Sequence, residues 1–569
     1  MLAPKWKTAD LMAAMKREKN YKKYTRQAFK AVLIGLGSCT FSALWANNIR
    51  VDSVRLKDQQ SAQQYTMVEF NLAWENSWRD TLNWDAAWVF VKYRRNGGVW
   101  QHASLAASGH QPPTGAQIDP SNDGKGVFIY RDAIGSGNNN FRKVELRWNY
   151  GLDGVPDYAP VDVMVFAIEM VYVPQGAFYV GTGGSEDRSF TEGSAWNQAT
   201  TLPFQIHSET APIILDSVAN ALWIKSRRDT FNNPVWTRAD SISIGPTGQL
   251  ESAYPKGFAS FYCMKYEITQ GQYRDFLNML TRRQQDTLTN SDLNDSLIEF
   301  TYVMADSLNT VLARQAIRCD SLQSVEDPIV FYCDLNENGT GNESDDGEWI
   351  ACNRISWMDG LAYADWAGLR PMSELEYEKA CRGTAYPVPN EFPWGTDAVK
   401  AGNPRYTLSN SGTSAEAVAS GYSTVPQEGN VASLNTLPSG FGPLRVGIFA
   451  DHASSAGRMS SGASYYGIME LGGNVTERVV GIYNLQARSF QGSHGDGELD
   501  ESGYANNSDW PGFATRPDGV VSRADGAGLR GGYWGSVFPL SRVSNRRQAD
   551  DINTARSINL GFRAVRTAP

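Results

Sequence analysis

Two adjacent glycines near the C-terminus constrain the fold of this chain more than any other feature. Gly531 and Gly532 stand in the run Leu-Arg-Gly-Gly-Tyr-Trp-Gly-Ser, and they suit a strand that bends or lets another backbone approach closely. The run Gly-Phe-Arg-Ala-Val-Arg at 561–566 alternates, so Phe562 and Ala564 face one side and the arginine between them faces the other. Together the two runs predict a sheet that the C-terminus closes.

Four earlier blocks stand in a fixed order before these runs. They are Met-Val-Tyr-Val-Pro-Gln-Gly-Ala-Phe from residue 170, Met-Lys-Tyr-Glu-Ile-Thr-Gln-Gly-Gln-Tyr from 264, Ser-Trp-Met-Asp-Gly from 356 through Glu-Tyr-Glu-Lys-Ala from 376, and Gly-Ile-Met-Glu-Leu-Gly-Gly-Asn-Val-Thr-Glu from 467. With the C-terminal block they resemble the formylglycine-generating enzyme (sulfatase-modifying-factor) family over about residues 168–567. The resemblance implies a C-type-lectin-like domain and an α+β fold.

The same resemblance bears on activity. Catalytic members of that family carry two cysteines five residues apart, shortly after the glycine pair, and their thiolates bind Cu(I), a soft ion that prefers soft ligands. The resemblance puts those positions at or beside Ser536 and Ser541, and no cysteine follows Cys381. A serine hydroxyl cannot replace a thiolate towards Cu(I). We therefore expect no copper and no enzyme activity of the family's kind, and we interpret the chain as a pseudoenzyme.

An enzyme that reuses the family groove with other residues is the alternative. Arginines in this region can bind a carboxylate or a sulfate bidentately, although arginines at such positions also serve as structural ion-pair partners. The residues that would line the groove for a ligand or a partner are Trp534, Ser536, Ser541, Arg542, Asn545 and Arg546.

The start of the chain, residues 1–46, is typical of an export segment. Seven lysines and arginines fall within residues 16–30, and an uncharged, mostly apolar run follows from 31 to 46. A basic region before a short apolar one predicts a secretory signal. Two alternatives remain open, namely a bacterial lipoprotein box that would make Cys39 an acylated first residue, and a retained anchoring segment. The expected location is extracellular, on the cell surface, or in the periplasm or outer membrane of a bacterium.

Residues 47–167 are predicted to form a separate all-β module. The segments 68–74, 87–93 and 143–148 alternate with period two, and glycine- and asparagine-rich turns separate them. This pattern favours an immunoglobulin- or fibronectin-like sandwich. Tryptophans in the module, of which Trp78 and Trp84 lie near a turn, allow a carbohydrate-binding interpretation, but tryptophans at strand positions more often pack in a core.

The lectin-like domain is expected to span residues 168–569, with an insertion at 281–352. Residues 269–280 predict an amphipathic helix capped by Thr269, and residues 359–366 predict a second helix. Within the insertion, residues 286–317 follow a helical pattern, with apolar residues at Leu297, Phe300, Val303 and Leu308.

The insertion ends in a candidate calcium loop. Oxygen side chains at positions 1, 3 and 5, a glycine at 6, a backbone carbonyl at 7 and a carboxylate at 12 have the spacing of an EF-hand loop. The residues at those positions are Asp334, Asn336, Asn338, Thr340 and Asp345. The alternative is an acidic turn that is simply solvated.

Two further calcium positions come from the resemblance. In Gly-Asn-Val-Thr-Glu, Asn474 and Glu477 match side-chain calcium ligands of the family, with a backbone carbonyl near Val475. A second family site would map to Asn430 and Val431, where the expected aspartate is replaced by Ser439 or is missing. The resemblance thus implies structural calcium, with a plain Gly-Asn turn as the alternative at Asn474.

The remaining cysteines leave several pairings open. Cys333 and Cys352 flank a polar loop and could close it as a disulfide, or Cys319 could pair with either. Cys381 falls in a helical pattern and is expected to be a buried free thiol. With Cys263, these are the five cysteines that remain if Cys39 is removed.

Charge and missing motifs exclude other classes of protein. The net charge of −9 and the pI near 5.3 argue against nucleic-acid binding. The closest two of the five histidines, at 102 and 110, are eight residues apart, and no P-loop or GxSxG motif occurs. We therefore expect an exported, non-catalytic structural or binding protein of the cell surface, whose partners are other proteins of a multi-subunit assembly or further copies of the chain. A glycan- or peptide-binding lectin-like module is a further alternative, and residues 484–528 are a candidate partner-facing loop.

Overall fold

A computed structural model describes residues 48–195, 198–224, 247–293, 300–320, 327–400, 406–434, 442–455, 457–515, 517 and 519–569. The export segment 1–46 with Cys39, and also Leu297 and Ser439, lie outside the described residues. No helix in the described part of the chain is both long and apolar enough to cross a membrane.

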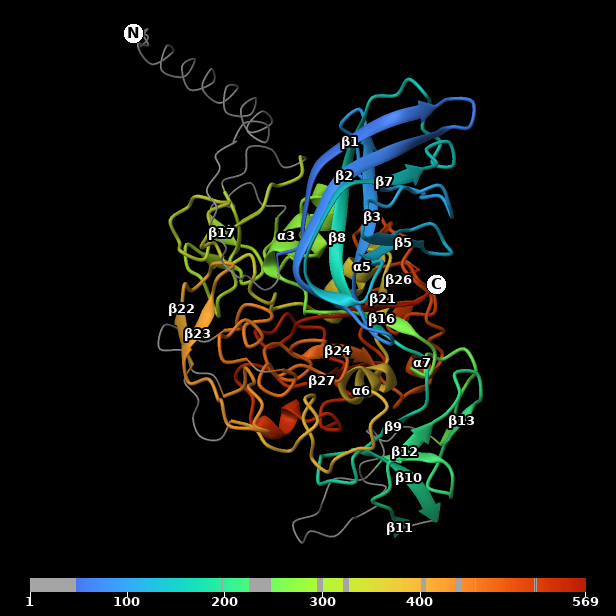
Figure 1. Ribbon diagram of the computed structural model, residues 1–569, viewed down its shortest axis with the longest axis vertical. Coiled ribbons are helices and arrows are strands. Elements are labelled where there is room, and N and C mark those ends of the chain that lie inside the picture. Colours follow the sequence, from blue (N-terminus) through green and yellow to red (C-terminus); the bar gives the residue numbers. More distant parts are fainter. Residues whose placement is uncertain are drawn as a thin grey trace, which may run out of the picture. The chain divides into compact units, whose positions relative to one another are not determined.

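The first part of the described chain forms two packed β layers (Figure 1). One layer has the order β1-β2-β7, and the other contains β8, β3, β6 and β5, with β4 beside β3. Their shared core includes Phe70, Trp74, Val89 and Trp148. The predicted segments 68–74, 87–93 and 143–148 lie in β2, β3 and β7. The bounds are β1 Arg50–Gln60, β2 Tyr65–Arg79, β3 Asp85–Arg95, β4 Gln101–His102, β5 Ala116–Pro120, β6 Val127–Arg131, β7 Gly135–Trp148 and β8 Val161–Val173.

Strand β8 joins this part to the rest of the molecule. It pairs with β3 from residue 161 to 171, and its last residues, Met170 to Val173, also pair with β16 (Phe261–Met264). The sheet continues from β16 to β28 (Ala564–Thr567) and β21 (Arg370–Pro371). The expected boundary between residues 167 and 168 thus falls inside a strand, and the two predicted domains share one sheet.

The C-terminal strand closes this sheet as the alternation predicts. β28 lies between β16 and β21. Phe562 and Ala564 pack in one core, whereas Val565 packs in another on the opposite face. Arg563 also faces away from Phe562 and is buried against a carboxylate.

Short serine and threonine signals fix the helices of the second part. Thr269, Thr281, Ser356 and Ser373 each accept a hydrogen bond from the backbone three residues on, and the side chain at that position bonds back, which makes a capping box. The helix predicted at 269–280 is therefore found, and the one predicted at 359–366 begins two residues earlier. The bounds are α3 Gln270–Leu277, α4 Arg282–Thr287, α5 Trp357–Trp366, α6 Glu374–Arg382, α7 Leu485–Arg488 and the 3-10 turn η3 Phe538–Ser541.

Small sheets make up most of the remaining regular structure. Their bounds are β9 Phe178–Val180, β10 Phe190–Ala195, β11 Gln198–Ala199, β12 Phe204–Ile206, β13 Ile213–Leu215, β14 Leu222–Ile224, β15 Gly248–Leu250, β17 Thr301–Tyr302, β18 Ser307–Leu308, β19 Ile317–Cys319, β20 Tyr332–Cys333, β22 Thr407–Ser409, β23 Ala417–Ser420, β24 Glu477–Val480, β25 Phe513–Ala514, β26 Val520–Val521 and β27 Ala527–Arg530. β24 pairs with β27, and α6 lies beside them (Figure 1).

The helix predicted for residues 286–317 is wrong. After α4 ends at Thr287, the described residues form β17, β18 and β19 instead. Phe300, Asp306, Asn309 and Ala313 have positive φ angles, which a helix does not allow. Apolar spacing misled the prediction because Val303 is buried by strand contacts, whereas Leu308 is largely exposed.

Candidate functional site

The glycine pair and the two serines after it form one small site. Gly532 has φ +70, and a Cβ placed on it would lie 2.8 Å from Ser536 Oγ and 3.1 Å from Ser541 Oγ. Both hydroxyls therefore face the same point, in a buried setting. Ser536 Oγ donates to Tyr533 O at 2.9 Å and accepts from Tyr533 N at 3.0 Å, whereas no described residue bonds Ser541 Oγ.

The other residues predicted for the groove have different surroundings. Trp534 is buried, and its Nε1 donates to Ile558 O at 3.3 Å. Arg542 Nη1 donates to Asn390 Oδ1 at 3.2 Å, and Asn545 Oδ1 accepts from Arg547 N at 3.1 Å. These contacts hold the side chains within the protein, so the described geometry does not display a set of free anion-binding groups.

Arg546 in particular is occupied by an internal partner. Its Nε and Nη2 donate to the two carboxylate oxygens of Glu374 at 2.7 and 2.9 Å, which is a bidentate pair. Only 2 % of Arg546 is exposed. The sequence left two roles open for this arginine, which were binding of an anionic ligand and a structural ion pair. The contacts with Glu374 support the structural ion pair.

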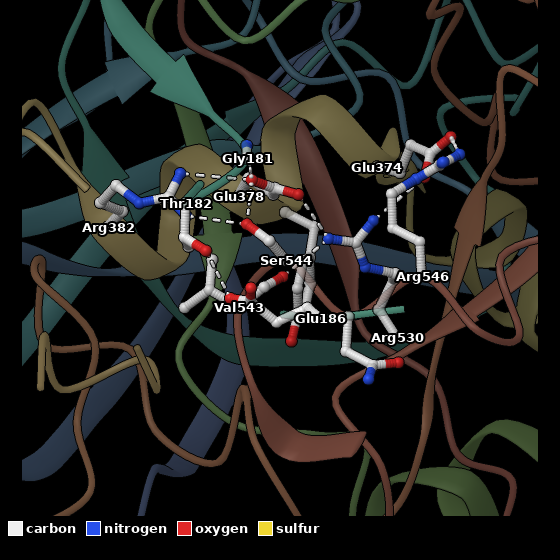
Figure 2. A network of polar contacts seen from close by, with 12 residues as sticks. Gly181, Thr182, Glu186, Glu374, Glu378, Arg382, Arg530, Val543, Ser544 and Arg546 are labelled. Carbon is white, nitrogen blue, oxygen red and sulfur yellow. Dashed lines mark hydrogen bonds and ion pairs between the residues drawn. The ribbon is translucent and has the colours of Figure 1, made fainter. Parts of the chain in front are cut away.

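Arg546 belongs to a larger buried network around α6 (Figure 2). Arg530, which directly precedes the glycine pair, donates to Glu374 at 3.0 Å and to Glu378 at 2.7 Å. Glu378 also accepts from Arg382, from Ser544 Oγ at 2.9 Å and from Gly181 N at 2.8 Å. Burial would raise the pKa of Glu378, but Arg530 and Arg382 reverse this and hold the pKa below its usual value.

This network fixes the backbone on both sides of the serine site. It ties β27, the segment after Ser541, and the strand end at Gly181 to one helix. The role of Glu374 and Glu378 as ion-pair partners was not predicted from the sequence. Their signal was present as two acids four residues apart on a predicted helix, but only the tertiary fold brings the arginines to them.

The Gly-Asn-Val-Thr-Glu turn lies in a second buried cluster of charges. Asn474 Nδ2 donates to Glu267 at 2.6 Å, and Asn474 Oδ1 accepts from Leu444 N at 2.8 Å. Val475 N donates to Glu267 at 2.9 Å. The predicted ligand Asn474 thus uses its side chain within the protein, and it holds the turn against Glu267.

Glu477 differs from Asn474 because half of its carboxylate is unused. Glu477 Oε1 accepts from Arg563, whereas Oε2 is buried and has no hydrogen-bond partner among the described residues. Glu470 has the same pattern, with Oε1 on Gly447 N at 2.9 Å and Oε2 unpartnered. Burial raises the pKa of each of these two carboxyls to about 7, and burial together with Glu477 raises the pKa of Glu267.

The unpartnered oxygens of Glu470 and Glu477 are suitable ligands for a cation. Carboxylate oxygen is the ligand that calcium prefers, and an unpartnered buried carboxylate is costly without a counter-charge. Glu477 fits that role as predicted, and Glu470, which the sequence analysis missed, fits it as well. Asn474 fits only if its bond to Leu444 N is broken.

The second calcium position is engaged by protein donors. Asn430 Oδ1 accepts from Ser423 N at 2.8 Å, and Asn430 Nδ2 donates to Ser460 O at 2.8 Å. Val431 O accepts from Tyr406 Oη at 3.3 Å. In the described geometry this turn is held by hydrogen bonds, and calcium there stays a prediction.

The oxygens of the predicted EF-hand loop accept hydrogen bonds and an ion pair from within the protein. Asp334 is buried and ion-paired with Arg318, and its oxygens also accept from Asn338 N and Gly339 N. Asn336 Oδ1 likewise accepts from Asn338 N, and Asn338 Oδ1 accepts from Thr340 N. The acceptors of Asp334, Asn336 and Asn338 therefore stabilise the loop's own turns.

A different acidic set lies close by. Carboxylate oxygens of Glu343, Asp345 and Asp346 lie within 4.8 Å of one another. Burial raises the pKa of Asp346 to about 6. Of the predicted EF-hand ligands, Asp345 belongs to this carboxylate cluster.

The predicted disulfides are absent among the described residues. All five described cysteines are buried free thiols, namely Cys263, Cys319, Cys333, Cys352 and Cys381. A free thiol was expected for Cys381, whereas the pairings considered among Cys319, Cys333 and Cys352 do not form. Burial raises the pKa of Cys263 to about 12 and that of Cys319 to about 11, which makes both poor nucleophiles and poor metal ligands.

Tryptophans of two candidate contact surfaces pack against other residues of the chain. Trp84 stacks on Tyr172 with ring centroids 4.1 Å apart, and Trp78 Nε1 donates to Asn83. Trp510, in the loop proposed to face a partner, is 1 % exposed and donates to Ser493 O. These tryptophans therefore contribute to packing within the chain.

Comparisons with known proteins agree with the resemblance. The model of the "Sulfatase-modifying factor enzyme 1-like domain" matches residues 225–568. A formylglycine-generating enzyme from Thermomonospora curvata is 39% identical over 54 residues. That match covers 10% of this chain and 17% of the enzyme, so it speaks for a local likeness and not for the whole protein.

Proposed function

Because the chain belongs to the sulfatase-modifying factor enzyme 1-like family, we propose that it is a non-catalytic member, a pseudoenzyme that acts through binding. One observation carries the proposal. The two hydroxyls that converge beside Gly532 stand where the resemblance implies a cysteine pair. Oxygen of a serine is a hard, weakly acidic ligand, so this pair does not supply the two thiolates that Cu(I) requires.

The surrounding residues support the same conclusion. Arg546 and Arg530 are committed to Glu374 and Glu378, and Arg542 bonds Asn390. None of these contacts places a general base beside Ser536 or Ser541. The Ser536 hydroxyl bonds the Tyr533 backbone and the Ser433 hydroxyl, and neither group is a base.

A copper titration tests this proposal. The native chain should bind no Cu(I) at this site, whereas the Ser536→Cys/Ser541→Cys variant should bind about one equivalent, because the two side chains already face one point. Ser536→Ala/Ser541→Ala is the matched control, and the buried thiols are the same in all three proteins. Stoichiometric Cu(I) binding by the native chain that the alanine variant loses would overturn the proposal and favour an oxidoreductase that reuses the groove.

We also propose that calcium braces the turn at Glu477. Glu477 and Glu470 would hold the ion through their unpartnered oxygens, and the ion would supply positive charge to a cluster whose buried guanidinium is Arg563. Calcium should raise the thermal midpoint of the native chain, because a ligand that binds only the folded state stabilises it. Glu470→Gln should lose most of that rise, whereas Glu343→Gln in the insertion should keep it. Equal rises in both variants would place the effect elsewhere.

The wider role that we propose is an exported structural or binding protein within a cell-surface assembly. A C-type-lectin-like scaffold that carries loops, joined through one sheet to a two-layered β part of immunoglobulin-like type, offers two faces for protein partners. The mass of the protein in its own cell envelope, with and without a calcium chelator, tests this role. A large assembly that loosens on chelation supports it, whereas a monomer that ignores calcium favours the lectin-like alternative and calls for a glycan and peptide screen.

A further inference from the structure

A cavity of about 320 Å³ lies beside β8. It is lined by the β8 residues from Met164 to Glu169, by α3 and α5, and by Ile49 and Val51 next to the start of β1. It shares no lining residue with the serine site. Its chemistry is therefore a separate question from that of the glycine pair.

One edge of β8, the edge that faces away from β3, has no paired strand of the described chain along this cavity. On one side β8 pairs with β3 over residues 161 to 171. On the other side it pairs with β16 only from Met170 to Val173, and Lys265 N donates the last bond to Glu169 O at 2.9 Å. No strand of the described chain pairs with β8 on that side before Glu169.

The direction of the free backbone groups follows from the register. Successive residues of a strand point their backbone N–H and C=O to opposite sides. Because the Glu169 carbonyl points to the β16 side, the N–H and C=O groups of Val165 and Ala167 point there too. An unpaired strand edge is a template for another strand, and proteins usually protect such an edge with charge, proline or a bulge. Residues 164–168 carry none of these.

The cavity is aromatic on one face of β8. Phe166 stacks on Phe90 with centroids 5.4 Å apart, and Trp366 packs edge-on against Phe166 at 4.9 Å. All three line the cavity. This face suits apolar side chains.

The cavity is also acidic. Four carboxylates line it, those of Glu169, Glu267, Asp275 and Glu348, against the single lining cation Arg274. Arg274 is already bonded to Asp275 and Glu348. The lining therefore has more negative than positive charge.

Glu169 adds a specific acceptor to this charge. Its Oε2 is paired with Lys265 Nζ at 3.0 Å, whereas Oε1 is buried and no residue in the described part of the chain bonds it. Only 4 % of the residue is exposed, and burial raises its pKa to about 7 despite the lysine. A cationic donor that enters the cavity would satisfy this oxygen.

We propose that the cavity binds an extended peptide segment of a partner protein, which adds a strand to the free edge of β8 and directs a lysine or arginine side chain toward Glu169. The free edge points to a peptide, because a small amine would satisfy the carboxylate but leave Val165 and Ala167 unpaired. Alternate residues of the added strand would face the aromatic side and the acidic side. The proposal does not rest on the serine pair, so it stands or falls separately from the copper experiment.

Calorimetric titration of the full chain with defined peptides tests the proposal. The probe is the N-acetylated, C-amidated heptapeptide Val-Lys-Val-Lys-Val-Lys-Val. It should bind saturably, and the peptide with glutamate in place of lysine should bind at least about tenfold more weakly, which corresponds to roughly 1.4 kcal/mol.

Backbone methylation separates strand addition from simple charge attraction. One peptide is N-methylated at every valine, and another at every lysine. Only one of these sets of N–H groups can face β8, so the two peptides should differ in affinity by at least about tenfold. Equal binding of both would overturn strand addition, and the absence of saturable binding by any peptide would overturn the site.

Two proline variants locate the edge. Ala167→Pro removes an N–H that faces the cavity while it leaves the pairing with β3 unchanged, and it should weaken peptide binding at least about tenfold. Val163→Pro makes the same change four residues further along the same edge, outside the lining, and should leave affinity unchanged. If Ala167→Pro does not fold, Glu169→Gln replaces it, and this variant should lose the preference for the lysine peptide over the glutamate peptide. Retention of that preference would overturn the role of Glu169.

Discussion

Two buried clusters of glutamates in this protein differ in how their charge is compensated. In the α6 cluster, Glu374 and Glu378 face three arginines, and every carboxylate oxygen has a partner (Figure 2). In the turn cluster, Arg563 pairs with Glu477 and acts on Glu267 and Glu470 only electrostatically, and two carboxylate oxygens have no partner among the described residues. The residue types and the degree of burial are the same, so the difference lies in the number of donors that the fold supplies.

Full compensation and partial compensation have different consequences for a buried carboxylate. A buried carboxylate that is fully hydrogen-bonded and ion-paired stays charged and holds its neighbours in place. A buried carboxylate with an orphaned oxygen either takes up a proton or binds a cation. The pKa of Glu378 is lowered, whereas the pKa values of Glu470 and Glu477 are raised to about 7.

The largest effect is expected from breaking the compensated cluster. Arg530→Met removes the cation that joins Glu374 and Glu378, and it leaves buried negative charge with fewer partners. Removal of one member of a buried ion pair typically costs about 3–5 kcal/mol. Denaturant unfolding should show a loss of this size, whereas Arg523→Met at an exposed pair with Asp525 should cost less than about 1 kcal/mol. A loss for Arg530→Met no greater than that of the control would contradict the structural role.

A matched pair of glutamine variants sharpens the contrast. Glu378→Gln removes a charge that Arg530 and Arg382 need, so it should cost about 3 kcal/mol of unfolding free energy. Glu470→Gln removes a charge that lacks a partner and keeps the acceptor for Gly447 N, so at pH 8 without calcium it should cost less than about 1 kcal/mol or stabilise. The same unfolding experiment measures both, and similar losses would show that the two clusters are compensated alike.

The pH dependence of stability should differ in the same way. Glu470 has a folded-state pKa of about 7 against an ordinary value of 4.5, so the folded state holds its proton more tightly. Its contribution to stability is therefore complete below about pH 4.5 and is lost as the pH rises towards 7. Without calcium, the native chain should lose about 2 kcal/mol more than Glu470→Gln between pH 5 and 8. Saturating calcium should reduce this difference, since a cation lowers the pKa; identical pH profiles without calcium would contradict the shift.

Local signals predicted from the sequence were correct where the interactions are local. The helix after Thr269 follows from a capping box within four residues. Gly531 and Gly532 both adopt positive φ, and a Cβ on Gly531 would meet Glu477 and the carbonyl of Leu471, which is the close approach that the sequence indicated. The family resemblance had assigned Ser536 and Ser541 to one groove, and their hydroxyls face one point beside Gly532.

The failures of prediction arise from partners that are distant in the sequence. Arg318 reaches Asp334 from β19, and the EF-hand spacing alone did not reveal this ion pair, while calcium in the loop stays a prediction. Glu470 lies in the family block that begins at Gly467, but only the folded structure shows that one of its oxygens is buried without a partner among the described residues. Charge compensation depends on which side chains the fold brings together, and a spacing pattern does not contain that information.

The smallest expected effect applies the comparison to neutral groups at the serine site. Ser536 Oγ has partners on Tyr533, whereas Ser541 Oγ is buried without one. An unmade hydrogen bond in a buried site is a cost that alanine removes, so Ser541→Ala should be neutral or stabilise by up to about 1 kcal/mol, whereas Ser536→Ala should cost about 1 kcal/mol. Unfolding of the two variants under the same conditions measures the difference. A marked loss in Ser541→Ala would mean that its hydroxyl has a partner in solution, and the serine site would then resemble the compensated cluster more than the uncompensated one.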